Sequence, residues 1–98
     1  MSSSSDASGP VSYTLQTLTE ITQVSADQVL VYRSEGLLHA TEAAEAELAF
    51  DDDALHQLRR LEFLRHEYGA NLSGLRAFAE LQRRVEELSA EVRFLRAR

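Results

Sequence analysis

Residues 24–38, VSADQVLVYRSEGLL, carry side chains suited to binding another macromolecule rather than to catalysing a reaction. They have the form of the turn and second helix of a helix-turn-helix, an element that enters the major groove in proteins that read DNA. Groove reading needs arginine, lysine or amide side chains that reach base edges and phosphates. Ahead of its one base, Arg33, this helix offers Asp27, Gln28, Val29, Leu30, Val31 and Tyr32. The segment therefore indicates either a poor DNA reader or a surface that binds another protein.

No pattern of residues typical of catalysis or metal binding occurs in the sequence. His39, His56 and His66 are scattered, and the last two lie ten residues apart on one expected helix, so they cannot share a metal ion. The run Asp51–Asp53 lacks the glycine turn and the distant glutamate of a calcium loop, and helix capping accounts for it. Since metal-protease, nucleophile-elbow and glycine-rich phosphate motifs are also missing, we expect no enzymatic activity, no cofactor and no metal site.

The 98-residue chain has a formal net charge of −6, unevenly distributed. Residues 1–53 hold ten acidic side chains and one arginine, a net charge of −9, whereas residues 54–98 hold six acidic side chains and nine arginines, a net charge of +3. The half with the helix-turn-helix segment is thus the acidic half, the reverse of what phosphate attraction favours. A merely solvated acidic face would have the same composition, but an acidic half favours a basic protein partner over a nucleic acid.

Composition also indicates the broad class of the protein. The chain has no cysteine, so disulfides and thiolate metal sites are excluded. No apolar run approaches the ~18 residues of a membrane span, and the start of the chain, MSSSSDASGP, lacks the basic and apolar regions of a signal peptide. We expect a cytoplasmic protein with one folded domain, preceded by a disordered tail at residues 1–12.

The helix-turn-helix segment is framed by recognisable helix signals. Residues 14–23 have apolar side chains at helical spacing and predict a first helix. Ser25 is a good N-cap for the second helix, and Gln28 fits the capping box three residues later. That helix is expected to run to about Ser34 and to stop at Gly36.

Residues 37–50 predict a small wing. Leu37–His39 should leave the second helix in extended conformation, residues 40–47 should form a loop or hairpin tip, and Leu48–Phe50 should return as a strand.

Two longer helices are expected after the wing. Asp51 can cap a leucine-rich helix that continues to Tyr68 and ends at Gly69. Asn71 can cap a final helix from about Leu72 to Ala97, roughly 39 Å long at 1.5 Å per residue.

The final helix carries a heptad seam formed by Phe78, Leu81, Val85, Leu88, Val92 and Leu95. The helix is longer than so small a domain can cover, so residues 77–98 predict oligomerisation, most simply as a homodimer. The alternative is an intramolecular seam in which Leu75 and Phe78 pack on the core. Glu91 and Arg96 would complement each other in a parallel pair, but parallel and antiparallel pairing both remain open.

These parts together resemble the winged-helix domain of the MerR family over about residues 13–76. VSADQVLVYRSEGLL matches the MerR stretch Val-Ser, three variable residues, Leu-Arg-Tyr-Tyr-Glu, two variable residues, Gly-Leu. Leu30 stands at the position of the groove-facing arginine, Val31 at the first tyrosine, and Tyr32 at the second, on the packing side. The wing reads Ala46-Glu47-Leu48 where MerR proteins carry Gly-Tyr-Arg, and a glutamate beside phosphate is repulsive. The resemblance implies a mainly α fold: a winged helix-turn-helix with a β-hairpin wing and a long C-terminal dimerisation helix.

Within this superfamily nearly the whole chain is similar to the CbpM chaperone modulators, which bind and restrain the J-domain of the DnaJ-type co-chaperone CbpA. The matching segments are Tyr13-Thr14-Leu15, Val24-Ser25, Gly36-Leu37-Leu38, Phe50-Asp51-Asp52 and Leu64-Arg65-His66-Glu67, followed by the heptad helix. One departure is Leu48, where the resemblance implies a tryptophan in the wing.

J-domains present a basic helix surface to Hsp70, and an acidic modulator could compete for that surface. The residues expected to contact it are Asp27, Val29, Leu30, Arg33, Glu35, Glu42, Glu45 and Glu47. Apolar helical residues usually lie in a core, and one of Val29 and Leu30 is expected there; each glutamate could also be no more than a solvated charge.

Three hypotheses follow. The favoured one is a non-enzymatic modulator that binds a J-domain; the second is a MerR-type DNA-binding regulator, which the charge and the altered contact residues disfavour; the third is a scaffold or antitoxin-like partner of an unknown basic protein.

Overall fold

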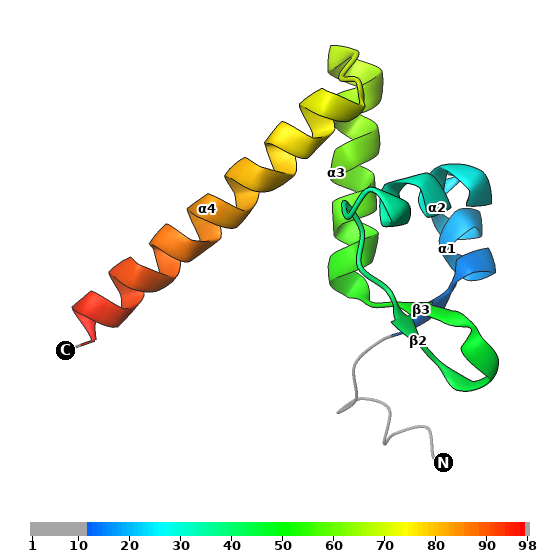
Figure 1. Ribbon diagram of the computed structural model, residues 1–98, viewed down its shortest axis with the longest axis horizontal. Helices are drawn as coiled ribbons and strands as arrows, with labels where there is room; N and C mark the ends of the chain where they lie inside the picture. Colours follow the sequence, from blue (N-terminus) through cyan, green and yellow to red (C-terminus); the bar gives the residue numbers. More distant parts are fainter. Residues whose placement is uncertain (1–11, 98) are drawn as a thin grey trace. The chain divides into compact units, whose positions relative to one another are not determined.

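The computed structural model describes residues 12–97, and only the backbone of Ala44. The elements are β1 (Tyr13–Thr14), α1 (Leu15–Thr22), α2 (Ala26–Ser34), β2 (Thr41–Glu42), η2 (Ala44–Ala46), β3 (Leu48–Phe50), α3 (Asp52–Tyr68) and α4 (Leu72–Arg96) (Figure 1). The chain divides into two compact units, and the boundary lies inside α3 between Phe63 and Leu64. The disordered tail expected at residues 1–12 lies, except for Ser12, outside the described residues, and the division into residues 13–76 and 77–98 stays a prediction.

Side-chain caps start the two short helices of the first unit. The Thr14 hydroxyl accepts the backbone N–H of Thr17 at 3.0 Å at the start of α1. The Ser25 hydroxyl accepts the backbone N–H of Gln28 at 3.1 Å at the start of α2. Each cap satisfies an N–H group that has no carbonyl partner within its helix. The predicted N-cap at Ser25 is confirmed.

The end of α2 is set by Gly36, whose φ of 78° lies in the left-handed region that a residue with a side chain rarely adopts. The N–H of Gly36 bonds to the Arg33 carbonyl at 3.0 Å, and the N–H of Leu37 bonds to the Tyr32 carbonyl at 2.9 Å. This pair of hydrogen bonds is a Schellman motif, which closes a helix and redirects the chain. The predicted stop at Gly36 is confirmed.

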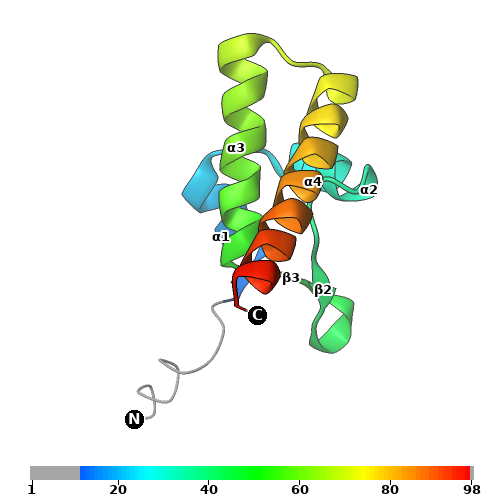
Figure 2. The same cartoon turned by 90° about the vertical axis from the view of Figure 1, so that its left-hand side faces the viewer.

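The wing belongs to a three-stranded antiparallel sheet in the order β1-β3-β2. In the central strand, Ala49 lies opposite Thr14 of β1 and opposite Thr41 of β2. The expected return strand at residues 48–50 is confirmed. The outgoing strand lies at Thr41–Glu42, inside the segment expected to be loop, and the third strand, β1, was not expected at all. Figure 2 shows the β2–β3 hairpin extending beyond the helices of this unit.

The core of the first unit draws on α1, α2, β3 and α3. Its most deeply buried members are Leu18, Val29, Tyr32, Phe50, Leu58 and Leu61, each at most 1% exposed. Full burial of such a side chain contributes roughly 1.5–3 kcal/mol to folding. Because Val29 and Tyr32 are three residues apart and both buried, α2 has a defined inner side, and the rest of the helix is directed to solvent.

One hydrogen bond caps the start of α3, and two others attach the helix to β1 and α2. The Asp51 carboxylate caps α3 by accepting the N–H of Ala54 at 2.9 Å, as predicted from the sequence. The Tyr13 hydroxyl of β1 donates to the Asp52 carboxylate at 2.6 Å. The Tyr32 hydroxyl of α2 donates to the Glu62 carboxylate at 2.5 Å. Both tyrosines link segments that are far apart in the sequence, and so they help to position α2 and the sheet on α3.

The second unit consists of the end of α3 and the 25-residue helix α4. Gly69, with φ 66°, follows α3, and the Asn71 side chain accepts the N–H of Gly74 at 2.9 Å, which caps α4. Both signals were predicted. Leu75 is buried, whereas five residues of the heptad seam are exposed: Leu81 (61%), Val85 (60%), Leu88 (61%), Val92 (46%) and Leu95 (57%). Phe78, the first seam residue, is half-buried. In the described part of the chain, no helix has the length and apolar character needed to cross a membrane.

Candidate recognition surface

The outward side of α2 exposes two neighbouring apolar side chains. Leu30 is 38% exposed and Val31 is 43% exposed, whereas Val29 and Tyr32 on either side of them are fully buried. Side chains on consecutive positions of a helix point in directions about 100° apart, so burial of positions 29 and 32 directs positions 30 and 31 away from the core. This pair is the apolar centre of a candidate binding surface.

The assignment of Val29 to the partner-contacting set is corrected by its burial. The sequence left open which of Val29 and Leu30 faces the core, and the structure places Val29 inside and Leu30 outside. The exposed residue that was missed is Val31. It could have been found from Tyr32, which was expected on the packing side: the residue three positions earlier, Val29, then lies on the same side of the helix.

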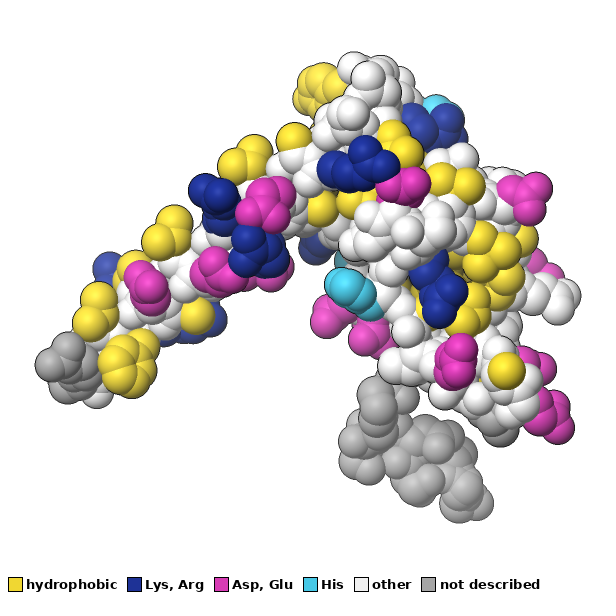
Figure 3. Space-filling model, viewed as in Figure 1, with side chains coloured by type: hydrophobic (Ala, Val, Ile, Leu, Met, Phe, Trp, Pro, Cys, Tyr) yellow, Lys and Arg dark blue, Asp and Glu magenta, His cyan; other side chains and the backbone are white. Residues whose placement is uncertain are grey.

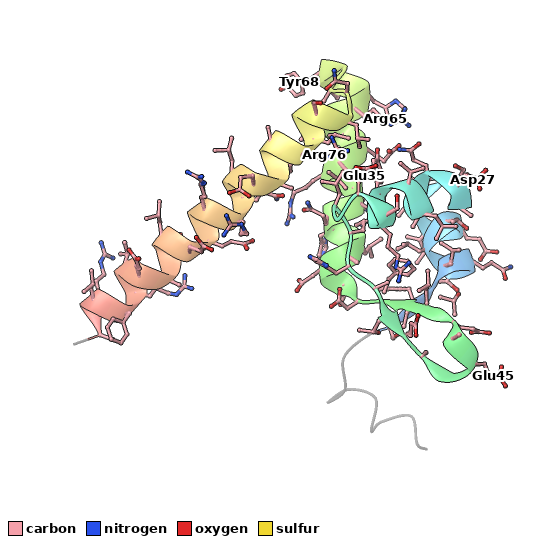
Figure 4. The ribbon with its side chains drawn as sticks, in the orientation of Figure 1. Asp27, Glu35, Glu45, Arg65, Tyr68 and Arg76 are labelled. Atoms are coloured by element: carbon pink, nitrogen blue, oxygen red, sulfur yellow. The ribbon has the colours of Figure 1, made fainter. Side chains whose placement is uncertain are left out.

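Charged side chains of α2 and the wing accompany this apolar pair. Asp27, Glu42, Glu45 and Glu47 are exposed, Glu35 is half-buried, and Arg33 is the only base before residue 59. In Figure 4, Asp27 and Glu35 mark the two ends of α2, and Glu45 lies at the wing tip. Figure 3 shows hydrophobic side chains in the middle of the first unit and acidic side chains towards its edges. We call this set the acidic recognition face: Asp27, Leu30, Val31, Arg33, Glu35, Glu42, Glu45 and Glu47.

The wing tip holds its carboxylates on a tight turn. Glu45 and Ala46 both have φ of 62°, in the left-handed region that residues with a side chain rarely adopt. The N–H of Ala43 bonds to the Glu47 carbonyl at 2.6 Å and closes a loop of three residues, 44–46. Asparagine and glycine usually occupy such positions, so the sequence offered no turn signal here. The turn leaves the side chains of Glu45 and Glu47 exposed to solvent.

Apart from Arg33, the same face lacks the basic and amide side chains that contact bases and phosphates in DNA-binding proteins. Leu30 and Val31, which the sequence resemblance aligns with a groove-facing arginine and a tyrosine of MerR regulators, are exposed, and Glu47 is exposed in the wing. None of the three can donate a hydrogen bond from its side chain to a base edge or to a phosphate. Arginine and lysine supply most of the attraction that proteins have for DNA, and the acidic recognition face has only Arg33.

Among residues 12–97, no three histidine, aspartate or glutamate side chains come together as a metal site. The three histidines remain apart: His39 follows α2, and His56 and His66 lie on α3.

Two helices joined by a tight turn, a hairpin wing and a long C-terminal helix define a winged helix-turn-helix protein. The family described as "MerR HTH family regulatory protein" matches residues 13–97, so the chain belongs to that family. No curated protein matches the sequence significantly.

Among solved structures, the chain is similar to the crystal structure of HiNmlR, described as a MerR family regulator lacking the sensor domain, bound to promoter DNA. The two have a TM-score of 0.67 and 23% sequence identity over 89% of this chain and 72% of that chain. At this identity the similarity concerns the fold alone. The predicted fold class, mainly α with a small wing and a winged helix-turn-helix, is confirmed.

Proposed function

We propose that the protein is a non-enzymatic modulator that binds the J-domain of a CbpA/DnaJ-type co-chaperone through the acidic recognition face and restrains its activity. The observation that carries the proposal is the exposed pair Leu30 and Val31, 38% and 43% exposed, on a helix that belongs to a segment with a net charge of −9. An apolar centre with an acidic rim suits a basic protein surface better than it suits a polyanion.

Binding would use the two kinds of side chain for different steps. The carboxylates of α2 and the wing attract the basic helix that a J-domain presents to Hsp70, and they raise the rate of encounter. Leu30 and Val31 then lose their solvent-accessible surface against the partner, which supplies affinity. Arg33 places one positive charge in this acidic face, and a carboxylate on the partner opposite Arg33 would complement it. Occupation of the basic helix would exclude Hsp70 and so restrain the co-chaperone.

The exposed heptad seam of α4 supports the further proposal that the protein works as a homodimer. Five large apolar residues between 46% and 61% exposed on one helix are more than a solvated helix normally presents. The heptad spacing of these residues suits a second helix.

A DNA-binding regulator is the second candidate, and one observation favours it: HiNmlR, which shares the fold, is bound to promoter DNA. The acidic recognition face argues against that function for this chain, because Glu47 stands where the resemblance to MerR proteins implies a contact near phosphate, and a carboxylate there is repulsive.

The experiment that separates the two candidates is a pair of titrations with the intact protein. Calorimetry with the J-domain of the cognate CbpA-type co-chaperone should show saturable binding, and fluorescence anisotropy with a labelled DNA duplex should show none at the same concentrations. Absence of a J-domain complex would remove the first candidate. Tight DNA binding that weakens steeply with added salt would establish the second.

A further inference from the structure

The small sheet carries a groove that is not part of the acidic recognition face. Its volume is about 270 Å³. The lining consists of Ser12, residues 39–41 and residues 49–51. Ala49 of β3 lies opposite Thr41 of β2, and directly opposed residues share one face of a sheet. Because the next residue, Phe50, is buried in the core, Ala49 lies on the outer face, where its short side chain leaves room above the central strand.

The groove combines apolar surface with one carboxylate. Ala40, Ala49 and Phe50 contribute apolar atoms to the lining, and Asp51 contributes a negative charge. The Oδ1 atom of Asp51 accepts the N–H of Ala54 at 2.9 Å, which caps α3. A carboxylate has about four lone-pair sites, so this bond uses only part of the acceptor capacity of Asp51.

The net charge at this end of the groove is negative. The N-terminus of α3 contributes roughly half a positive charge, and the three consecutive carboxylates Asp51, Asp52 and Asp53 outweigh it. The hydrogen bond that Tyr13 donates to Asp52 leaves the charge of that carboxylate in place. His39, which also lines the groove, can accept a hydrogen bond when its imidazole is neutral. The groove therefore favours a cation over an anion.

We propose that this groove is a pocket for one arginine side chain of the binding partner. The methylene stem of the arginine lies against Ala40, Ala49 and Phe50, and its guanidinium group bonds to Asp51. The volume of about 270 Å³ is smaller than the roughly 300–1,000 Å³ of a pocket for a drug-sized ligand, so it suits a single side chain. Arginine suits the site better than lysine does, because its planar fork can bond to both oxygens of a carboxylate.

The pocket would add an orienting contact to the proposed complex with a J-domain. The basic helix of the J-domain supplies the arginine, and this assignment of its source rests on the proposed function. Thr41 lines the groove and the next residue, Glu42, belongs to the acidic recognition face, so the two sites adjoin along β2. The acidic recognition face attracts the basic helix, and an arginine held at one point fixes the direction in which that helix lies.

A small probe tests the pocket without any J-domain. Nα-acetyl-arginine methylamide carries the arginine side chain between capped ends, and its titration into the intact isotope-labelled protein is followed by the backbone amide shifts in NMR spectra. We expect saturable shifts confined to the residues that line the groove, with a Kd on the order of millimolar. Nα-acetyl-norleucine methylamide, which has an uncharged stem, should bind about tenfold more weakly, because it cannot bond to Asp51.

Two variants test the charge and the space separately. Asp51→Asn removes the charge, and asparagine caps a helix about as well as aspartate does. Asp53→Asn is the matched control, with the same charge change on a residue outside the lining. Asp51→Asn should weaken binding of the arginine probe about fivefold, and Asp53→Asn by less than about twofold. Ala49→Leu fills the groove and should abolish the saturable shifts, with urea denaturation to show that the fold is retained.

The pocket is overturned if the arginine probe gives no saturable shifts, if its shifts spread over the acidic surface, or if the norleucine probe binds equally well. Titrations with the J-domain of the cognate CbpA-type co-chaperone then separate the two proposals. Asp51→Asn should bind the J-domain about fivefold more weakly than Asp53→Asn does. Equal binding by the two variants would overturn the arginine contact and leave the proposed function standing. If the wild-type protein binds the probe but no J-domain, the proposed function fails and the pocket stands.

Discussion

The Tyr32 hydroxyl donates a hydrogen bond to the Glu62 carboxylate at 2.5 Å, and this bond joins α2 to α3 across 30 residues of sequence. The ring of Tyr32 is fully buried, so the bond orients the helix from inside. It thereby turns Leu30 and Val31, the two residues just before Tyr32, towards solvent. The acidic recognition face thus depends on a contact on the opposite side of the same helix.

Removal of this bond should weaken the packing of α2 on α3 and so destabilise the fold. In Tyr32→Phe the ring still fills the core, and the Glu62 carboxylate, which is half-buried, loses a charge-assisted hydrogen bond. We expect a loss of about 1–2 kcal/mol in the free energy of unfolding, measured by urea denaturation. A variant as stable as the wild-type protein would show that the bond makes no net contribution to the free energy of unfolding.

The Tyr13–Asp52 contact predicts a shift in a titration. Donation of a hydrogen bond to the Asp52 carboxylate, together with desolvation and repulsion by that charge, raises the pKa of Tyr13 above its ordinary value of 10.0. The protonated phenol is the form that holds the bond, so the contribution to stability is present below pH 10.0 and is lost as the pH rises through the raised pKa. Asp52→Asn should move the pKa of Tyr13 back towards 10.0, as followed by NMR of the ring carbon. An unchanged titration would mean that the contact is not formed in solution.

One glycine substitution in the wing tip should increase the stability of the fold. Ala46 has φ of 62°, and a non-glycine residue in this conformation costs roughly 1–2 kcal/mol. Ala46→Gly should therefore raise the free energy of unfolding by up to about 1 kcal/mol. Ala43→Gly is the matched control: Ala43 lies in the same hairpin without a positive φ, so glycine there should lower stability. Equal effects of the two changes would contradict the left-handed turn.

Charges in the seam of α4 should prevent self-association. Leu81→Glu and Leu88→Glu place a carboxylate at positions that are 61% exposed in the single chain, so the fold should survive while the paired state is lost. Light scattering after size-exclusion chromatography should report a dimer for the wild-type protein and a monomer for both variants. Ala90→Glu, on the exposed outer side of α4, should leave the dimer intact. An unchanged mass in the seam variants would rule out the seam as the contact.

The helix boundaries were predictable because they depend on local chemistry. Ser25, Asp51 and Asn71 cap their helices through side chains that bond to the backbone three residues ahead, and Gly36 and Gly69 supply the positive φ that ends a helix. Each of these signals lies within four residues of the structure that it specifies, so the sequence alone was enough to place it.

The sheet and the orientation of α2 depend on distant contacts and were harder to predict. Strands β1 and β2 have two residues each, too few to show an alternating pattern, and both exist because β3 supplies hydrogen-bonding partners. The inner side of α2 was ambiguous because Val29, Leu30 and Val31 are all apolar, and only packing against the remaining core decides among them. Local sequence therefore predicted the elements, and tertiary contacts selected the exposed residues.

The apolar centre of the acidic recognition face should bind a J-domain, and a change at Leu30 tests this most directly. Leu30→Ala removes apolar surface from a side chain that is 38% exposed, and Ile21→Ala is the matched truncation of an aliphatic side chain, 43% exposed, on α1 outside the acidic recognition face. In calorimetric titrations with the J-domain of the cognate CbpA-type co-chaperone, Leu30→Ala should weaken binding about tenfold or more, as a buried anchor residue does. Ile21→Ala should bind as tightly as the wild-type protein. If Leu30→Ala binds as tightly as the wild-type protein, or if the wild-type protein gives no binding, the account is contradicted.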